Sequence, residues 1–228
     1  MRISVVMPSY NREAYLSEAI ESVLNQSFKD FEFIIVDDGS TDGSHYLYDY
    51  YKNDKRVKVE LLGKNMGIAY ARNHGIKCAS GEYIAVMDSD DVMVIDRLKL
   101  SLRAIKDVDF VYSPYGVFDG QDIKNHIPPA KVTLEDVEKN GAWPHVTIMA
   151  KRKCFIENPY KFRSNDDAWL VWQWFKAGYK SKMIKYPTMV VRYHQGNVSK
   201  TKQKEVEDVN RIIQEEIRNY RREQTATH

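Results

Sequence analysis

The chain has 228 residues, of which 43% are hydrophobic, so it is long enough for one α/β domain with a smaller appended half. Its 34 basic and 32 acidic residues give a formal net charge of +2, so no nucleic-acid partner is expected. The two cysteines, Cys78 and Cys154, are far apart and lack metal-type spacing, which favours reduced, inert thiols. No apolar stretch approaches the roughly 20 residues of a membrane-spanning helix. We therefore expect a cytoplasmic protein with at most peripheral contact with the inner face of a membrane.

The first half of the chain alternates short apolar runs with amphipathic segments. Buried strands are predicted at residues 3–7, 31–36, 57–61 and 83–87, and helices at residues 13–26 and 68–78. Between the second and third strands, a further helix is predicted to turn Tyr46, Leu47, Tyr50 and Tyr51 inward. Strands separated by helices of about 10–15 residues are typical of βαβ units, so a largely parallel sheet is expected.

The second half of the chain is less regular. A helix is predicted at residues 97–105, a strand at 109–113, a Trp-rich helix at 168–177 ended by Gly178, and a last strand at 189–193. Residues 114–147 are rich in proline and glycine, which predicts loops with one short helix near residues 133–139.

A polar helix is predicted from residue 202 onwards. Its apolar residues fall at helical spacing: Val206, Val209, Ile212, Ile213, Ile217 and Tyr220. This stripe favours packing against the body of the protein, and contact with a partner or a membrane surface is the alternative.

Asp88, Ser89 and Asp90 end the apolar run at residues 83–87, with Asp91 directly behind them. The carboxyl ends of buried parallel strands are where open α/β sheets bind ligands. Two carboxylates aimed into one cleft repel each other unless a cation neutralises them. Mg²⁺ carrying a nucleotide diphosphate would do so, because it takes one or two protein carboxylates and completes its shell with water and phosphate oxygens. A solvated acidic turn is the alternative.

Two further carboxylate pairs stand after predicted strands or in the loops that follow. Asp37 and Asp38 end the second strand, and Asp166 and Asp167 precede the Trp-rich helix. Because parallel strands end at the same edge of a sheet, the first pair should face the same crevice as Asp88, with Asp37 at its rim.

The loop after the first strand places Pro8, Tyr10 and Arg12 near the same crevice. An aromatic ring can stack on a base, and an arginine can pair with phosphate. Arg72, early in the helix at 68–78, is also expected at the rim, where it could meet a phosphate; a surface ion pair is the alternative. The sequence lacks G-x-G-x-x-G after the first strand, which argues against a dehydrogenase. It also lacks a G-x-x-x-x-G-K-[ST] loop, so a bound nucleotide would be held by carboxylates and a metal ion and not by a glycine-rich loop.

Four segments in order, residues 4–12, 34–42, 65–73 and 81–91, resemble the successive blocks of family-two glycosyltransferases of the GT-A fold. The resemblance is dense over residues 3–98 and thinner up to residue 200. It implies an α/β fold with a mostly parallel central sheet flanked by helices and a Rossmann-like, nucleotide-binding N-terminal half. It also implies metal-assisted sugar transfer, with inversion, from a nucleoside-diphosphate sugar to a hydroxyl. UDP-linked donors are commonest in the family, and the acceptor could be a saccharide, lipid-linked or other molecule.

The resemblance further implies roles for individual residues. The residues expected to contact the base, ribose and phosphates of the donor nucleotide are Pro8, Tyr10, Arg12, Asp37, Asp38, Arg72, Asp88 and Ser89. Asp90 would hold Mn²⁺ or Mg²⁺ on the diphosphate. His194 would reach the metal or the diphosphate, and a structural histidine is the alternative.

The general base is expected in the pair Asp166–Asp167, where the family has a Glu-Asp pair. Asp167 keeps the family's Asp and is the predicted base, because a carboxylate opposite the leaving diphosphate can accept the proton of the attacking hydroxyl. Asp166 departs from the family pattern and is assigned as its partner. Trp169 is predicted to stack on the acceptor sugar, whereas Trp172 and Trp174 are expected in the core.

These roles divide the chain into a donor-binding half (1–112), an acceptor-binding half with the base (113–200) and a polar tail (201–228). Two rival functions remain. A nucleotidyltransferase that makes nucleotide sugars would share the sheet, metal and carboxylates, but it would need a glycine- and basic-rich loop after the first strand. A non-catalytic nucleotide-sugar-binding module would be favoured if the base were lost, but Asp167 is present.

Overall fold

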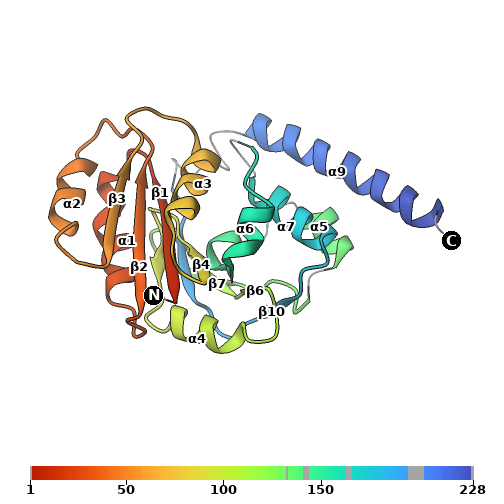
Figure 1. The fold of residues 1–228 in the computed structure, drawn as a ribbon, viewed down its shortest axis with the longest axis horizontal. Coiled ribbons are helices and arrows are strands. Elements are labelled where there is room, and N and C mark those ends of the chain that lie inside the picture. Colours follow the sequence, from red (N-terminus) through yellow and green to blue (C-terminus); the bar gives the residue numbers. More distant parts are fainter. Residues whose placement is uncertain (1, 132, 141–143, 163–165, 195–202, 227–228) are drawn as a thin grey trace.

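The computed structural model describes residues 2–131, 133–140, 144–162, 166–194 and 203–226, and it contains two sheets with helices on both faces of the larger one (Figure 1). The larger sheet has the order β10-β6-β9-β4-β1-β2-β3. Its strands are β1 (Ile3–Ser9), β2 (Phe31–Asp37), β3 (Val57–Leu61), β4 (Tyr83–Val86), β6 (Phe110–Tyr112), β9 (Met149–Lys151) and β10 (Ser181–Met183). Strands β4, β1, β2 and β3 are parallel neighbours, and only β9 runs antiparallel among the described strands of this sheet. The predicted mostly parallel central sheet is confirmed.

Alternate side chains of the buried strands pack into two hydrophobic cores, one on each face of the sheet. Val6 and Val36 point toward α3 (Ile68–Cys78), whereas Met7 and Ile35 point toward α1 (Glu13–Leu24). The remaining helices divide between the faces: α2 (Ser44–Tyr51) and α4 (Arg97–Ala104) pack with α1, while α5 (Leu134–Asn140), α6 (Arg152–Glu157) and α7 (Asp166–Lys176) pack with α3. Figure 1 shows α1 and α2 on one side of the sheet and α3, α6 and α7 on the other. Burial on both faces explains why these strands read as continuous apolar runs.

A second, four-stranded sheet has the order β5-β11-β7-β8. Its strands are β5 (Val92–Met93), β7 (Tyr115–Phe118), β8 (Ile123–His126) and β11 (Met189–Arg192). The hairpin β7–β8 replaces part of the predicted loop region at 114–147, and β9, β10 and α6 were not predicted either. All four residues of β8 are exposed, so this strand carries no hydrophobic periodicity that would reveal it in the sequence.

The inward face of α2 matches the prediction for Leu47 and Tyr51, which pack in the core, but not for Tyr46 and Tyr50. Tyr48 and Tyr51 are buried, whereas Tyr46 and Tyr50 point to solvent. Both pairs have helical spacing, so periodicity alone did not distinguish them. The Tyr48 hydroxyl donates a hydrogen bond to Asp37 Oδ1 (3.0 Å), and this tertiary contact fits the face that the structure buries.

Helix α9 (Gln203–Ala226) packs one apolar stripe, as predicted, and extends away from the body of the molecule (Figure 1). Val209, Ile213 and Ile217 are buried in the core, while Ile212 is exposed and Val206 lies outside the described side chains. No helix in the described part of the chain is long and apolar enough to cross a membrane.

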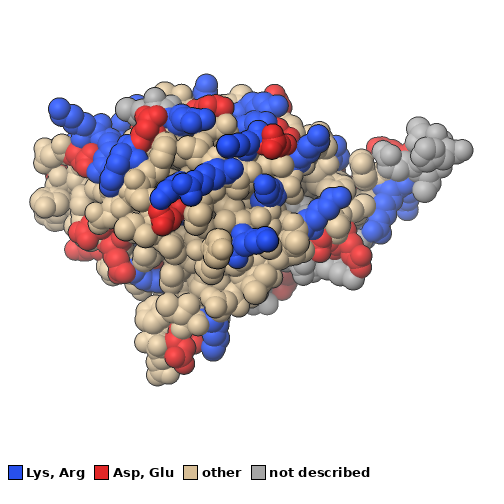
Figure 2. Space-filling view, turned by 90° about the horizontal axis from the view of Figure 1, so that it is seen from below, with Lys and Arg blue, Asp and Glu red and all other residues tan. Residues whose placement is uncertain are grey.

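The surface charges are mixed in sign on the face seen in Figure 2. Lysine and arginine side chains are spread over this face, with aspartate and glutamate side chains between them and along its margins. Interspersed charges of this kind are typical of a solvated surface and differ from the single-sign stripe of a nucleic-acid-binding face.

Candidate active site

The carboxyl ends of β1, β2 and β4 meet at one edge of the larger sheet. The register pairs Ser9 at the end of β1 with Asp37 at the end of β2, and it pairs Val6 with Val86 near the end of β4. The segment Asp88–Asp90 follows directly, so the predicted carboxylates gather on the same edge.

Asp90 is contacted by two predicted site residues from distant parts of the chain. Its Oδ2 lies 3.2 Å from Arg12 Nε and 3.0 Å from His194 Nε2, and all three side chains are largely buried. The His194 ring also stacks on Tyr15, with 4.7 Å between ring centroids. Strand β11, paired with β5, carries the chain to this point.

The Asp90–His194 pair fits one edge of a divalent-metal site. Adjacent ligands of an octahedral Mg²⁺, each bound at 2.0–2.1 Å, lie about 3 Å apart. The Oδ2–Nε2 separation of 3.0 Å matches that spacing. Water and diphosphate oxygens would supply the other positions, as expected for this ion.

Asp88 pairs with Arg72, whose Nη2 lies 2.8 Å from Asp88 Oδ1. Burial raises the pKa of Asp88, but the neighbouring basic groups, chiefly Arg72, together outweigh burial and hold this pKa below its usual value. Only 4% of Arg72 and 1% of Asp37 are exposed, so the expected placement of both at the crevice rim is wrong. Both residues lie beneath the rim. Arg72 is held there by its largely buried ion pair with Asp88. Asp37 is held by hydrogen bonds that it accepts from α2 and from its own loop.

Three residues that the sequence analysis missed, Tyr160, His145 and Asn73, support the helix turn that carries Arg72. The guanidinium carbon lies 5.3 Å from the centre of the Tyr160 ring, and the Tyr160 hydroxyl lies 2.6 Å from His145 Nε2. Asn73 and the Tyr160 backbone exchange two hydrogen bonds of 2.8 and 3.0 Å. Burial first, and then the Arg72 charge, lower the pKa of His145 well below its usual value, so its imidazole is neutral. These partners are up to 87 residues apart in the sequence, where no local pattern connects them.

Asp37 is held by Tyr48 and by its own turn. Tyr48 donates to Oδ1 at 3.0 Å, and the backbone N–H of Ser40 donates to Oδ2 at 3.0 Å. Burial and the neighbouring Asp37 charge raise the pKa of Tyr48, so this hydroxyl stays protonated and continues to donate.

Asp38 holds the loop that leads into α3. Its two oxygens accept hydrogen bonds from the backbone N–H groups of Met66 (2.6 Å) and Gly67 (2.8 Å). Gly67 has φ = 94°, a conformation that favours glycine, so this turn depends on both residues. In this structure Asp38 positions the start of the helix that carries Arg72, and its direct contact with a nucleotide stays a prediction.

The loop after β1 is tied to the loop after β2. Asn11, with φ = 50°, donates its backbone N–H to Ser40 Oγ (2.9 Å) and accepts the backbone N–H of Thr41 at its side chain (2.8 Å). The neighbouring Tyr10 side chain is exposed beside this junction and can offer its ring to a base. Pro8 lies within β1, the strand that ends at this loop.

Asp91 and Arg97 form a second buried layer behind the cluster, together with the nearly buried Ser89. Asp91 Oδ1 accepts the backbone N–H of Arg192 at 3.0 Å, and burial together with the nearby Asp88 and Asp90 charges raises the pKa of Asp91 well above its usual value. The guanidinium of Arg97 donates to Val86 O at 2.7 Å, and burial lowers the pKa of Arg97 to about 9. Sequence patterning did not identify Arg97, because an arginine early in an amphipathic helix is normally solvent-exposed.

Asp167 lies in the first turn of α7. Burial raises the pKa of Tyr115, and the charges of Asp91 and Asp167 raise it further. The Asp167 side chain is half-buried, whereas that of Asp166 lies outside the described side chains.

The tryptophans of α7 are largely buried. Trp172 and Trp174 have no exposed surface, which confirms their expected place in the core. Trp169 is 7% exposed, packs edge-to-face on Phe162 and carries Lys161 Nζ 4.6 Å from its ring centre. Stacking of a sugar on Trp169 stays a prediction, and it would require the small exposed part of this ring or movement of Lys161.

Known proteins are similar to this chain in sequence. The family model for glycosyl transferase family 2 matches residues 4–167, well over half of the chain. An uncharacterised glycosyltransferase of Rickettsia felis is 46% identical over 112 residues, which is 49% of this chain and 18% of that protein. The Escherichia coli enzyme UDP-Glc:alpha-D-GlcNAc-diphosphoundecaprenol beta-1,3-glucosyltransferase WfgD is 31% identical over 163 residues, 70% of this chain and 63% of that enzyme. The chain thus spans less than two thirds of either relative.

Two solved structures share the fold. Residues 1–349 of S. aureus TarS in complex with UDP-GlcNAc match with a TM-score of 0.74 and 23% identity, over 86% of this chain and 60% of that one. The mannosyltransferase PcManGT from Pyrobaculum calidifontis, in complex with GDP-Man and Mn²⁺, matches with a TM-score of 0.65 and 18% identity, over 84% of this chain and 56% of that one. The chain has the GT-A fold and belongs to glycosyl transferase family 2.

Proposed function

We propose that this chain carries the donor site and general base of an inverting, metal-assisted glycosyltransferase that moves a sugar from a UDP-linked donor to a hydroxyl acceptor. The observation that carries this proposal is the junction of Arg12, Asp90 and His194 beside the Arg72–Asp88 pair. Four separate segments bring two arginines, a histidine and two carboxylates to one edge of the sheet. This combination suits a metal-bound diphosphate next to a ribose.

The donor assignment follows from the chemistry of the cluster. Tyr10 offers a ring for the base, Asp37 and Asp88 offer oxygens for the ribose hydroxyls, and Arg12 and Arg72 offer positive charge for the phosphates. Pro8, Asp38 and Ser89 would complete the walls of this pocket. The names of the E. coli relative and of the TarS complex contain UDP-linked sugars, which supports UDP over other nucleotides.

Asp90 and His194 would hold Mn²⁺ or Mg²⁺, and the bound cation would offset the charge that develops on the leaving diphosphate. The presence of Mn²⁺ in the PcManGT complex supports this choice. Asp90 and the diphosphate are both anionic, so a cation between them would offset their repulsion.

Asp167 would act as the general base. The acceptor oxygen attacks the anomeric carbon from the face opposite the diphosphate, the bond to the leaving oxygen breaks, and the acceptor proton passes to the Asp167 carboxylate. Attack from the opposite face inverts the anomeric configuration. Asp166, beside it at the start of α7, would orient that carboxylate.

Residues 113–200 would bind the acceptor, residues 1–112 would bind the donor, and residues 201–228 would form a tail. The E. coli relative is named for a diphosphoundecaprenol-linked acceptor, so a saccharide or lipid-linked hydroxyl is the proposed acceptor class. Such a substrate would place the protein on the cytoplasmic face of a membrane by peripheral contact. Trp169 is the proposed sugar-stacking side chain.

The decisive experiment is calorimetry of UDP binding with and without Mn²⁺. We expect binding to require the ion and to weaken at least about 10-fold in Asp90→Asn and His194→Ala, since both remove a metal ligand. Asp122→Asn, on the exposed β7–β8 turn, is the control and should bind UDP normally. Equal affinity for UDP in EDTA would contradict the metal-bridged site.

A product assay separates the rival functions. The proposed enzyme releases UDP from a UDP-sugar, whereas a nucleotidyltransferase would release pyrophosphate from UTP and a sugar phosphate. Mn²⁺-dependent UDP binding without either product, even with a range of hydroxyl acceptors, would favour the non-catalytic binding module.

A further inference from the structure

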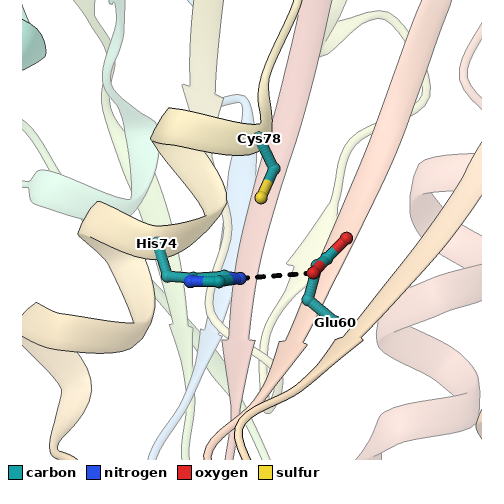
Figure 3. Close-up of side chains that lie close together, drawn as sticks. All are labelled: Glu60, His74 and Cys78. Atoms are coloured by element: carbon teal, nitrogen blue, oxygen red, sulfur yellow. Dashed lines mark hydrogen bonds and ion pairs between the residues drawn. The ribbon is translucent and has the colours of Figure 1, made fainter.

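Three metal-binding side chains meet at the far edge of the larger sheet. Glu60 lies on the edge strand β3, and His74 and Cys78 lie on α3. One ligand atom from each lies within 4.8 Å of the others, and His74 Nε2 is 3.2 Å from Glu60 Oε2. Figure 3 shows the imidazole, carboxylate and thiol turned toward a common space between the helix and the strand. Strands β1 and β2 separate β3 from β4, which leads to Asp88 and Asp90, so this cluster is distinct from the donor site.

The local fold explains why these side chains converge. His74 and Cys78 are four residues apart on a helix, so they share one face. Gly75 lets this helix approach the sheet, because a Cβ atom there would lie 2.6 Å from Val6 Cγ1. The spacing of the two cysteines did not reveal this cluster, because the neighbours of Cys78 are a histidine one turn away and a glutamate on the neighbouring strand.

We propose that Glu60, His74 and Cys78 bind a zinc-class divalent transition metal ion that joins β3 to α3. Around a tetrahedral Zn²⁺, nitrogen and oxygen ligands lie about 3.4 Å apart, and nitrogen and sulfur ligands about 3.6 Å apart. The His74–Glu60 separation of 3.2 Å is already close to that value, and closing the widest gap from 4.8 Å requires a shift of about 1 Å, which side-chain rotation supplies.

The exposure of the cluster leaves room for a fourth ligand. The side chains of Glu60 and His74 are 38% and 32% exposed, so a water molecule can reach the remaining position. The nearby Lys58 does not oppose a cation strongly, because its Nζ is paired with Glu32 at 2.6 Å. A thiolate and an imidazole favour Zn²⁺ or Co²⁺ over Mg²⁺ and Mn²⁺, so the two metal sites would select different ions.

Cobalt titration tests the site on the full chain after chelator treatment. Co²⁺ bound to Cys78 should give a thiolate-to-cobalt charge-transfer absorption that saturates at one ion per chain, and Zn²⁺ should displace it. Cys78→Ser should abolish this absorption, whereas Cys154→Ser is the matched control and should keep it, since Cys154 is fully buried elsewhere. His74→Ala and Glu60→Gln should weaken Zn²⁺ binding more than about 100-fold, because even supporting residues of metal ligands cost 10–100-fold.

A further variant distinguishes metal binding at this cluster from metal binding at the donor site. Asp90→Asn should leave the cobalt absorption unchanged while it weakens Mn²⁺-dependent UDP binding. Zn²⁺ at about 100 times its dissociation constant should raise the Tm of the wild type by about 5–10 °C. The Tm of Glu60→Gln should rise far less. This variant is expected to fold, because the Glu60 side chain is half-exposed. The proposal is overturned if the wild type gives no thiolate absorption with Co²⁺, or if the absorption survives in Cys78→Ser.

Discussion

The carboxylates that end β2 and those that follow β4 lie on the same edge of the sheet but are held in different ways. Asp37 and Asp38 accept hydrogen bonds from Tyr48 and from three backbone N–H groups. Asp88 and Asp90 instead pair with Arg72, Arg12 and His194. Backbone donors stay fixed while the fold persists, whereas a side chain such as Arg12 can rotate away and leave Asp90 to a metal ion. The first pair therefore shapes the site, and the second is suited to exchange its partners when a donor binds.

The largest expected effect concerns a third carboxylate, Asp167 in the first turn of α7. Asp167→Asn should lower the rate of sugar transfer about 10²–10⁴-fold and leave UDP affinity unchanged, because Asn keeps the shape but cannot accept the proton. Single-turnover product formation and calorimetry measure the two quantities. Asp166→Asn is the control and should be milder. If Asp166→Asn abolishes transfer while Asp167→Asn stays near wild type, the base is Asp166.

Removal of a carboxylate that the fold holds should cost stability. Asp38→Ala leaves two backbone donors without their acceptor, so the free energy of unfolding should fall by about 2–4 kcal/mol. UDP affinity should fall as well, because the loop before α3 no longer positions Arg72. Urea unfolding checks the first effect. Asp42 also accepts two backbone N–H groups, but in a more exposed loop, so Asp42→Ala should cost only about 1 kcal/mol.

Glu32 extends the comparison to the opposite end of β2. Burial raises its pKa, but hydrogen bonds from Lys58, Ser4 and Ser80 outweigh burial and lower it from 4.5 to about 2. A carboxylate with a lowered folded-state pKa stabilises the fold above its unfolded-state pKa. That stability, at most about 3 kcal/mol, should be lost as pH falls from 4.5 toward 2.

Glu32→Gln should therefore reduce stability at pH 7 and flatten the acid side of the curve of unfolding free energy against pH. The exposed Glu21→Gln serves as the control and should keep the wild-type slope. A wild-type slope in Glu32→Gln would show that another group dominates acid unfolding.

The smallest effect should come from the support beneath Arg72. Tyr160→Phe removes the hydroxyl that meets His145 but keeps the ring under the guanidinium, so it should cost about 1 kcal/mol of stability and little UDP affinity. Tyr160→Leu removes the ring as well and should weaken UDP binding further, because Arg72 loses its cation–π contact. Equal UDP affinities in the two variants would exclude a positioning role for the ring.

Much of the donor half could be predicted from the sequence, because its signals are local. Apolar runs at β1, β2, β3 and β4 report burial on both faces of the sheet, and carboxylates directly after such runs must lie at its carboxyl edge. For the same reason the helix at Ile68–Cys78 was predicted with its observed bounds. The face of α2 was predicted only in part. Leu47 and Tyr51 turn inward as expected, but Tyr48 is buried and Tyr46 and Tyr50 are exposed, because more than one stripe fits the helical period.

The structure of residues 113–200 and the contacts that support the site depended on tertiary structure. Strand β8 is exposed and polar, so it carries no periodicity, and it forms by pairing with β7. Asn73 and Tyr160 meet across 87 residues, and Glu60 meets His74 and Cys78 only because α3 lies against β3. By itself the sequence determined the order of elements, the mostly parallel sheet and the edge where the carboxylates gather. Which cation each carboxylate meets, and which buried groups support it, was decided by long-range packing, because such contacts join residues that no local pattern relates.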